Sequence, residues 1–129
     1  MARVLLDTHI WLWAIADSAA IPAPLRDRLR ARRDTFLISA ASAWEIAIKA
    51  PLGRLRLPVE PTEFLRGVIR DLPVVELPIT LAHAARVAEL PLHHRDPFDR
   101  ILIAQAQIEG LSIMTIDRAF GAYGVPLIR

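Results

Sequence analysis

Short apolar segments that favour β-strands alternate with helical segments along the chain, and this alternation constrains the fold more than any other feature. The strand-like segments are Arg3–Leu6, Phe36–Ile38, Pro73–Leu77, Ser112–Ile116 and Val125–Ile128. The helical segments are His9–Ala16, Leu25–Arg33, Ser39–Ala50, Thr62–Asp71, Leu81–Leu90 and Pro97–Glu109. This order predicts a three-layer α/β/α domain with a central parallel sheet of about four or five strands.

Length and composition fit one domain that spans residues 1–129, because a hydrophobic fraction of 53% is ample for a single core. No apolar run approaches the roughly 18 to 20 residues that cross a bilayer, and the N-terminus lacks the pattern of a signal peptide. We therefore expect a cytoplasmic protein with no membrane partner. The absence of cysteine excludes disulfides and thiolate metal sites, so any metal must be held by oxygen or imidazole ligands.

The basic residues are almost all arginine. Sixteen Lys and Arg residues against fourteen Asp and Glu residues give a formal net charge of +2. Arginine forks match phosphate oxygens, so nucleic acid is a candidate partner, although so small a net charge does not establish one. The arginines of the helix at residues 26–33 fit an RNA-binding face or, more simply, a solvated surface.

Two acidic residues follow predicted strands and two lie on helices that begin near the same edge of the sheet. Asp7 follows the first strand and Asp117 follows the fourth, while Glu45 and Asp99 stand near the starts of their helices. Ligands of parallel sheets bind beyond the carboxyl ends of the strands, so four carboxylates are expected to converge there. Such a cluster stays ionised only when cations neutralise it. An all-oxygen site suits Mg²⁺ first and Mn²⁺ second.

Each acidic residue also has a simpler explanation. Asp7, Asp96 and Asp99 could serve only as helix caps or as favourable charges at helix N-termini, and Asp117 could be a turn residue. The segment Ser42–Glu45 matches a capping box, in which the glutamate would bond a backbone amide. From spacing alone that reading is as good as the metal reading. Joint placement at one sheet edge favours the metal site, since independent caps have no reason to collect there.

Four segments, taken in order, resemble the motifs of PIN-domain ribonucleases, and specifically those of the VapC-type toxins of toxin–antitoxin pairs. The segments are Leu5–His9, Ser42–Lys49, Asp96–Ala106 and Thr115–Asp117. The resemblance covers the chain almost end to end. It implies a PIN fold, Mg²⁺-dependent endoribonuclease activity, frequent homodimerisation, and inhibition by a VapB-like antitoxin whose tail covers the acidic groove.

The resemblance also assigns residues. Asp7, Glu45, Asp99 and Asp117 match the four metal-binding acids in turn, and Thr115 resembles the small hydroxyl residue that orients an acid or a water. Accessory candidates are Asp96, which is favoured as a cap, Thr8 beside Asp7, and Arg100, which would hold a phosphate or offset the acidic cluster.

Histidine and tryptophan residues lie near these motifs. His9 is expected near the pocket without binding metal, and the loop residues His93 and His94 are more readily substrate contacts than ligands. Trp11, Trp13 and Trp44 are numerous for so short a chain. Core packing explains some of them, and the remainder suggest a dimer surface or the groove where an antitoxin helix would dock.

The reaction expected from these residues is hydrolysis of an RNA phosphodiester, in which water attacks phosphorus in line and leaves 5′-phosphate and 3′-hydroxyl ends. Phosphotransfer domains of the receiver or haloacid-dehalogenase type also place an Asp after the first strand. They fit poorly, because Asp7-Thr8-His9 lacks a second acid and no lysine follows a late strand. Two alternatives remain open: a catalytically silent PIN-like module that binds RNA or protein, and a solitary RNA-processing nuclease.

Overall fold

The computed structural model describes residues 2–16, 18–57, 59–71 and 74–129, and five parallel strands form its central sheet. The strands are β1 (Arg3–Leu6), β2 (Thr35–Ser39), β3 (Val75–Leu77), β4 (Ser112–Met114) and β5 (Leu127–Ile128), in the spatial order β3-β2-β1-β4-β5. The predicted three-layer fold with a parallel sheet is confirmed.

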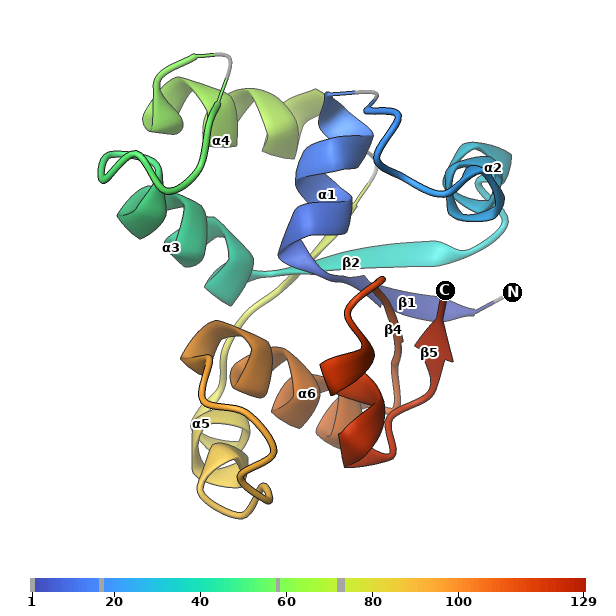
Figure 1. Cartoon of the computed structure of the whole chain (residues 1–129), viewed down its shortest axis with the longest axis vertical. Helices are drawn as coiled ribbons and strands as arrows, with labels where there is room; N and C mark the ends of the chain where they lie inside the picture. Colours follow the sequence, from blue (N-terminus) through green and yellow to red (C-terminus); the bar gives the residue numbers. More distant parts are fainter. Residues whose placement is uncertain (1, 17, 58, 72–73) are drawn as a thin grey trace.

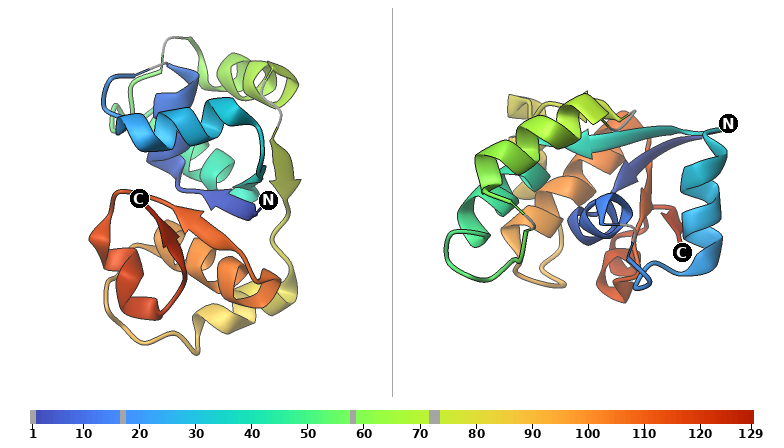
Figure 2. Two further views of the ribbon diagram at one scale, coloured as in Figure 1. Left: turned by 90° about the vertical axis from the view of Figure 1, so that its right-hand side faces the viewer. Right: turned by 90° about the horizontal axis from the view of Figure 1, so that it is seen from above.

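Helices cover both faces of the sheet. Figure 1 shows one group above the strands and another below them, and the left-hand view of Figure 2 shows the same layering. The upper group is α1 (Thr8–Ile15), α2 (Ala23–Ala31), α3 (Ala40–Lys49) and α4 (Pro61–Asp71). The lower group is α5 (Leu81–Val87), α6 (Pro97–Glu109) and the 3₁₀ helix η1 (Arg118–Tyr123).

The core is divided between the two faces of the sheet because side chains alternate along each strand. Val4 and Leu6 pack with Trp11 and the upper helices, whereas Leu5 packs with Ile103 and the lower ones. These three apolar residues of β1 are all buried. A strand buried on both faces reads as an uninterrupted apolar run, which is why the segment after Arg3 has no polar residue before the strand ends.

The strand order reverses direction next to β1, and this reversal positions the acidic residues. The chain moves outward from β1 through β2 to β3, then returns to β4 and β5 on the other side of β1. Such a switch point opens a crevice beyond the carboxyl ends of the strands. Asp7 follows β1 and Asp117 follows β4 at this edge, while α1 and α3 begin there directly after their strands.

Several boundaries differ by one to three residues from the sequence-based expectation; α2 runs from Ala23 to Ala31 and β5 begins at Leu127, and the ends of β4 and α5 also differ. β4 ends at Met114 and not at Ile116, because β5 offers only two residues for pairing. α5 ends at Val87 and not at Leu90, because the next three amides bond carbonyls three residues back in a tightened turn. The expected strand start at Pro73 lies outside the described residues. Within the described part of the chain, no helix is long and apolar enough to cross a membrane.

Candidate metal centre

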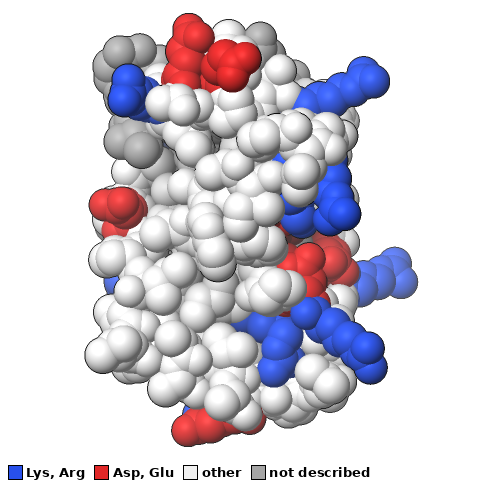
Figure 3. All heavy atoms as spheres, turned by 90° about the vertical axis from the view of Figure 1, so that its left-hand side faces the viewer, with Lys and Arg blue, Asp and Glu red and all other residues white. Residues whose placement is uncertain are grey.

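A pocket of about 410 Å³ lies beyond the carboxyl ends of the strands, and five carboxylates line it. They belong to Asp7, Glu45, Asp96, Asp99 and Asp117. The remaining lining residues are His9, Trp13, Lys49 and Ile116. Figure 3 looks onto this side of the molecule and shows Asp and Glu atoms at its middle, bordered above and below by Lys and Arg atoms. The sheet therefore collects the four acids expected from the sequence, together with Asp96, around one hollow.

Asp7 occupies the N-cap position of α1, but its side chain makes no capping hydrogen bond. Its carboxylate instead accepts a hydrogen bond of 2.8 Å from the Thr115 hydroxyl, and the Thr115 oxygen accepts one from the backbone N–H of Asp117. Asp7 is only 5% exposed. The pKa of Asp7 is raised, mainly by burial. The hydrogen bond from Thr115 lowers this pKa, and the charge of Glu45 raises it further.

Glu45 does not belong to a capping box. The N-cap of α3 is Ser39, which accepts from the backbone N–H of Ala41, and Ser42 lies within the helix, where its oxygen accepts from the Thr8 hydroxyl at 2.8 Å. Glu45 is 3% exposed, and its Oε2 contacts Lys49 Nζ at 2.5 Å. Its Oε1 is buried and has no hydrogen-bond partner among the described residues.

Asp96 and Asp99 divide two tasks at the start of α6. Asp96 is the N-cap, and its Oδ1 accepts from the backbone N–H groups of Phe98 and Asp99 at 2.9 and 3.2 Å. The Asp99 side chain makes no such bond and faces the pocket. Burial, followed by the charges of the other four carboxylates with Asp96 foremost, raises the pKa of Asp99 to about 8. The predicted capping role of Asp96 is confirmed, although the residue also lines the pocket.

Asp117 is the most exposed member of the group. It caps η1 through a hydrogen bond of 2.9 Å that Oδ1 accepts from the backbone N–H of Ala119. This is the simpler role that the sequence allowed for it. The other oxygen of the carboxylate is not used in that bond, so capping and a place at the pocket wall are compatible.

The residues fit a hard divalent cation. Hard ions prefer oxygen ligands, and here the buried Glu45 Oε1 lacks a partner while neighbouring carboxylates disfavour the ionised form of Asp99. Across the described residues no three Asp, Glu or His side chains already form a compact ligand group. A cation would therefore have to draw the carboxylates together, and it would relieve the repulsion that now separates them.

The PIN domain family model matches residues 4–126. The chain belongs to the PIN-domain family. It is 28% identical to Ribonuclease VapC22 of Mycobacterium tuberculosis over 127 residues, which cover 98% of this chain and 95% of that protein. PIN-domain ribonucleases are in general dependent on divalent metals.

Solved structures share the PIN fold at low sequence identity. One is VapBC from Salmonella typhimurium bound to DNA, with a TM-score of 0.73, 18% identity, and coverage of 99% of this chain and 98% of that chain. Another is VapBC2 from Rickettsia felis bound to a promoter DNA fragment, with a TM-score of 0.72, 16% identity, and coverage of 98% and 97%. At such identities these matches establish the fold alone.

Arg100 does not face the pocket of this PIN domain. Its guanidinium is buried and donates to the backbone oxygens of Val87, Leu90 and Pro91 at 2.9 to 3.3 Å, and to the Tyr123 hydroxyl at 3.3 Å. The expectation that Arg100 holds a phosphate or offsets the acids is therefore wrong. Arginine offers several donors in a fixed fork, and the carbonyls left free at the end of α5 take them up.

His94 links this arginine anchor to the pocket. The Tyr123 hydroxyl oxygen accepts from Arg100 Nη1 and from the backbone N–H of His94, and it lies 2.7 Å from His94 Nδ1. On the other side of the ring, His94 Nε2 lies 3.5 Å from Asp99 Oδ2. His9 and Trp13 line the pocket, as expected for His9, while the ring of His93 packs on Tyr123.

Lys49 is the pocket residue that motif reasoning left without a role. It is the only lysine in the chain and stands four residues after Glu45, on the same face of α3. That spacing is a signal for a helical ion pair, so the contact with Glu45 was available from the sequence. The attraction of Lys49 to the acids of two other segments depended on tertiary structure.

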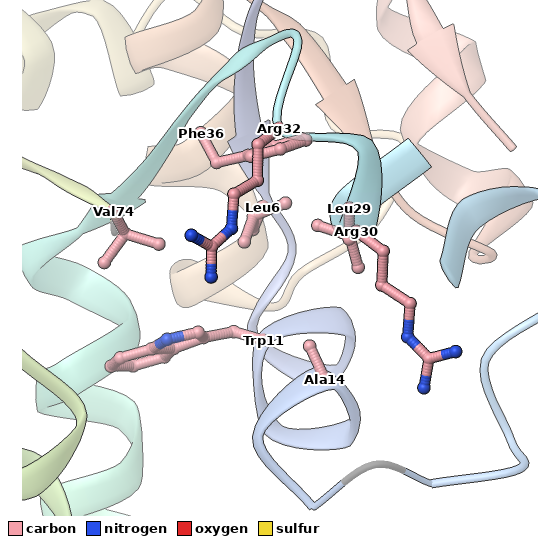
Figure 4. A pocket seen from close by; sticks show the side chains of 8 residues that line it. All are labelled: Leu6, Trp11, Ala14, Leu29, Arg30, Arg32, Phe36 and Val74. Atoms are coloured by element: carbon pink, nitrogen blue, oxygen red, sulfur yellow. The ribbon is translucent and has the colours of Figure 1, made fainter. Parts of the chain in front are cut away.

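A second, less polar pocket of about 240 Å³ lies between α1, α2 and β2, and we call it the α1–α2 groove. Its lining residues are Leu6, Trp11, Ala14, Leu29, Arg30, Arg32, Phe36 and Val74. Figure 4 shows Arg32 reaching toward the indole of Trp11 while Arg30 points away from it. Trp11 Nε1 is buried and has no hydrogen-bond partner among the described residues. The groove thus combines apolar walls with two kinds of hydrogen-bond donor.

Proposed function

We propose that this PIN domain is a Mg²⁺-dependent endoribonuclease, with Mn²⁺ as a substitute, and the toxic component of a VapBC-like pair. The observation that carries the proposal is the pocket that the carboxylates of Asp7, Glu45, Asp99 and Asp117 line together. Family membership and the relative named as a ribonuclease support the same activity. Cleavage of RNA also fits the cytoplasmic location that the sequence predicts.

In this proposal the four carboxylates would hold the ion, and each lies in a different local environment. Thr115 fixes the rotamer of Asp7, Glu45 offers the unpartnered Oε1, and Asp117 stands at the exposed rim. Bound Mg²⁺ would neutralise the pocket, acidify water for in-line attack and stabilise charge on the phosphodiester. The chain itself supplies no covalent nucleophile, since it has no cysteine and no Gly-x-Ser-x-Gly turn.

Cleavage of a mixed, structured RNA by the purified protein tests this proposal. We expect cutting in Mg²⁺ or Mn²⁺ that stops in EDTA and in a folded Asp99→Asn variant. End analysis should give 5′-phosphate and 3′-hydroxyl products. Intact RNA in both metals, with any copurified inhibitor removed, would instead favour the alternative of a PIN-like binding module. A nuclease without a cognate antitoxin would be a solitary processing enzyme.

We further propose that a VapB-like antitoxin inserts an amphipathic segment into the α1–α2 groove. Several structural neighbours are toxin–antitoxin complexes. The groove suits an apolar side chain flanked by a carboxylate or carbonyl oxygen, because Trp11 Nε1 needs an acceptor and Arg32 supplies positive charge. Residue pairs of this kind, aromatic and arginine, are common energetic anchors of interfaces.

The antitoxin proposal is tested by coexpression with any small protein encoded directly upstream of this gene, followed by measurement of the dissociation constant. Arg32→Glu should weaken the complex by about tenfold or more, since it places like charges across the groove. Arg33→Glu, an exposed neighbour outside the lining, is the matched control. Equal affinities for the two variants would exclude the groove as the docking site.

The expected homodimer stays a prediction. On α3 and just beyond it, Trp44, Ile48 and Leu52 recur every fourth residue, and Trp44 is 61% exposed while Leu52 is 65% exposed. A stripe of this kind on a surface helix is typical of an association face. Sedimentation of wild type against Ile48→Glu tests it: a dimer that dissociates in the variant supports the prediction, and a wild-type monomer at high concentration contradicts it.

A further inference from the structure

Lys49 is held inside the acid pocket by several independent contacts. Its Nζ lies 2.5 Å from Glu45 Oε2 and 5.3 Å from the centre of the Phe98 ring. Burial disfavours its charged form, yet the hydrogen bond with Glu45 and the charges of Glu45, Asp96 and Asp99 together raise the pKa of Lys49. The only ammonium group supplied by a side chain of this protein thus sits among the carboxylates that we assign to metal binding.

Lys49 and a divalent ion would compete for the same charge. A doubly charged ion on Glu45 would repel the ammonium with twice the charge that one carboxylate offers to attract it. Glu45 is 3% exposed and sits within a helix, so a divalent ion held on its free Oε1 would stand within a few ångströms of the ammonium on Oε2 and would repel it. The Phe98 ring, 5.3 Å from Nζ, and the charge of Asp96 also attract the ammonium, and both would still do so after Glu45 is taken up by the ion.

We infer that Lys49 is the resident counter-cation of the metal-free pocket, and that a divalent ion binds by taking Glu45 from it. The inference rests on the proposed function in one respect, namely that the pocket binds Mg²⁺. It explains how carboxylates from four segments stay together without metal, because a tethered cation offsets part of their repulsion. It also gives the displaced ammonium a position from which to meet an RNA phosphate.

The uniqueness of Lys49 makes the displacement directly measurable. An amine-reactive reagent is applied to the protein in EDTA and in saturating Mg²⁺ at equal ionic strength, and modification of Lys49 is quantified on the peptide that carries it. Release from Glu45 should increase the labelling rate roughly tenfold, because in EDTA the reagent must first break the charge-assisted hydrogen bond between Lys49 and Glu45. Asp99→Asn, which keeps Lys49 and Glu45 but weakens metal binding, should lose most of this increase. Lys49→Arg supplies the background at that peptide.

Mg²⁺ affinity gives a second measurement that does not depend on cleavage. Lys49→Met removes the competing charge, so calorimetry at pH 8.5 should show Mg²⁺ binding about tenfold tighter than in wild type, whereas Lys49→Arg should stay near wild type. Circular dichroism verifies that each variant is folded.

The outcomes separate the inference from the proposed function. If Mg²⁺ binds and RNA is cut while Lys49 labelling does not change with metal, Lys49 keeps Glu45 in the loaded protein and the inference is overturned. If calorimetry detects no Mg²⁺ binding and no RNA is cut, the proposed function fails and the inference fails with it. Faster labelling in Mg²⁺, abolished by Asp99→Asn, supports both.

Discussion

Asp99 and Arg100 are adjacent on α6, yet the structure treats their charges in opposite ways. Arg100 points into the end of α5, where backbone carbonyls and the Tyr123 hydroxyl take up its donors. Asp99 points into a pocket in which burial, and after it the charges of the neighbouring carboxylates, raise its pKa to about 8. A buried charge with complete partners stabilises the fold by itself, whereas one among like charges needs something from outside. The contrast marks the first as structural and the second as a binding group.

Substitution of Asp99 is expected to have the largest effect. Asp99→Asn should reduce RNA cleavage about a thousandfold, or ~4 kcal/mol of transition-state stabilisation, because it removes a charge from the proposed metal site. Asp27→Asn, the same change on the exposed part of α2, is the matched control. Initial rates at saturating Mg²⁺ measure both. A variant that retains a tenth of the wild-type rate would remove Asp99 from the metal site.

Substitution of Arg100 is expected to lower the stability of the protein. Arg100→Met should lower the free energy of unfolding by about 3 kcal/mol, because several buried carbonyl oxygens lose their donor at once. Arg100→Lys should recover only part of this, since an ammonium cannot reproduce the guanidinium fork. Urea denaturation compares them with Arg33→Met at an exposed position. Equal midpoints for Arg100→Met and Arg33→Met would mean that the anchor contributes nothing.

The raised pKa of Asp99 predicts a pH dependence of the metal-free protein. Between the ordinary pKa of 3.8 and the folded value of about 8, the native state holds a proton that the unfolded state has lost. Stability therefore falls as pH rises through this window, by at most about 6 kcal/mol from this group, at about 1.4 kcal/mol per pH unit over about four units. Asp99→Asn should flatten the profile measured by urea denaturation in EDTA, and Mg²⁺ should restore wild-type stability at pH 8. A wild-type profile as flat as the variant's would contradict the shift.

A smaller effect is expected from the residue that orients Asp7. Thr115→Val removes the hydroxyl that donates to Asp7 and accepts from the amide of Asp117. Loss of such a supporting group should weaken Mg²⁺ binding about tenfold by calorimetry. Thr115→Ser keeps the hydroxyl and should stay within about threefold of wild type under the same principle. If valine and serine behave alike, packing at Thr115 matters and the hydrogen bond does not.

The smallest effect concerns the link between the two regions. Tyr123→Phe deletes the hydroxyl that joins Arg100 to His94, and through His94 to the neighbourhood of Asp99. We expect a loss of about 1 kcal/mol in stability and a modest fall in cleavage, since Arg100 keeps its carbonyl partners. Thermal unfolding and cleavage rates, measured on the same preparation, test this. A loss as large as that of Arg100→Met would show that the hydroxyl, and not the carbonyls, holds the anchor.

Local patterns in the sequence determined much of this protein. The alternation of apolar runs and helices fixes the layers, because a helix or strand must bury its apolar side against a neighbour. The residues Asp96 and Gly110 bound α6 as their types predict, with Gly110 at φ 66°. The positions of Asp7 and Glu45 after the first two strands, and of Asp117 after the fourth, also follow from chain order at the carboxyl edge of a parallel sheet.

Tertiary structure decided which way individual side chains point. The sequence allowed Glu45 to close a capping box and Arg100 to face the acids, and both readings are wrong because neighbours distant in the chain compete for these groups. Ser42 pairs with Thr8, and Arg100 is drawn to carbonyls that α5 leaves open. Hydrogen bonds and charges act over a few ångströms, so their partners are set by what folding brings together and not by proximity in sequence.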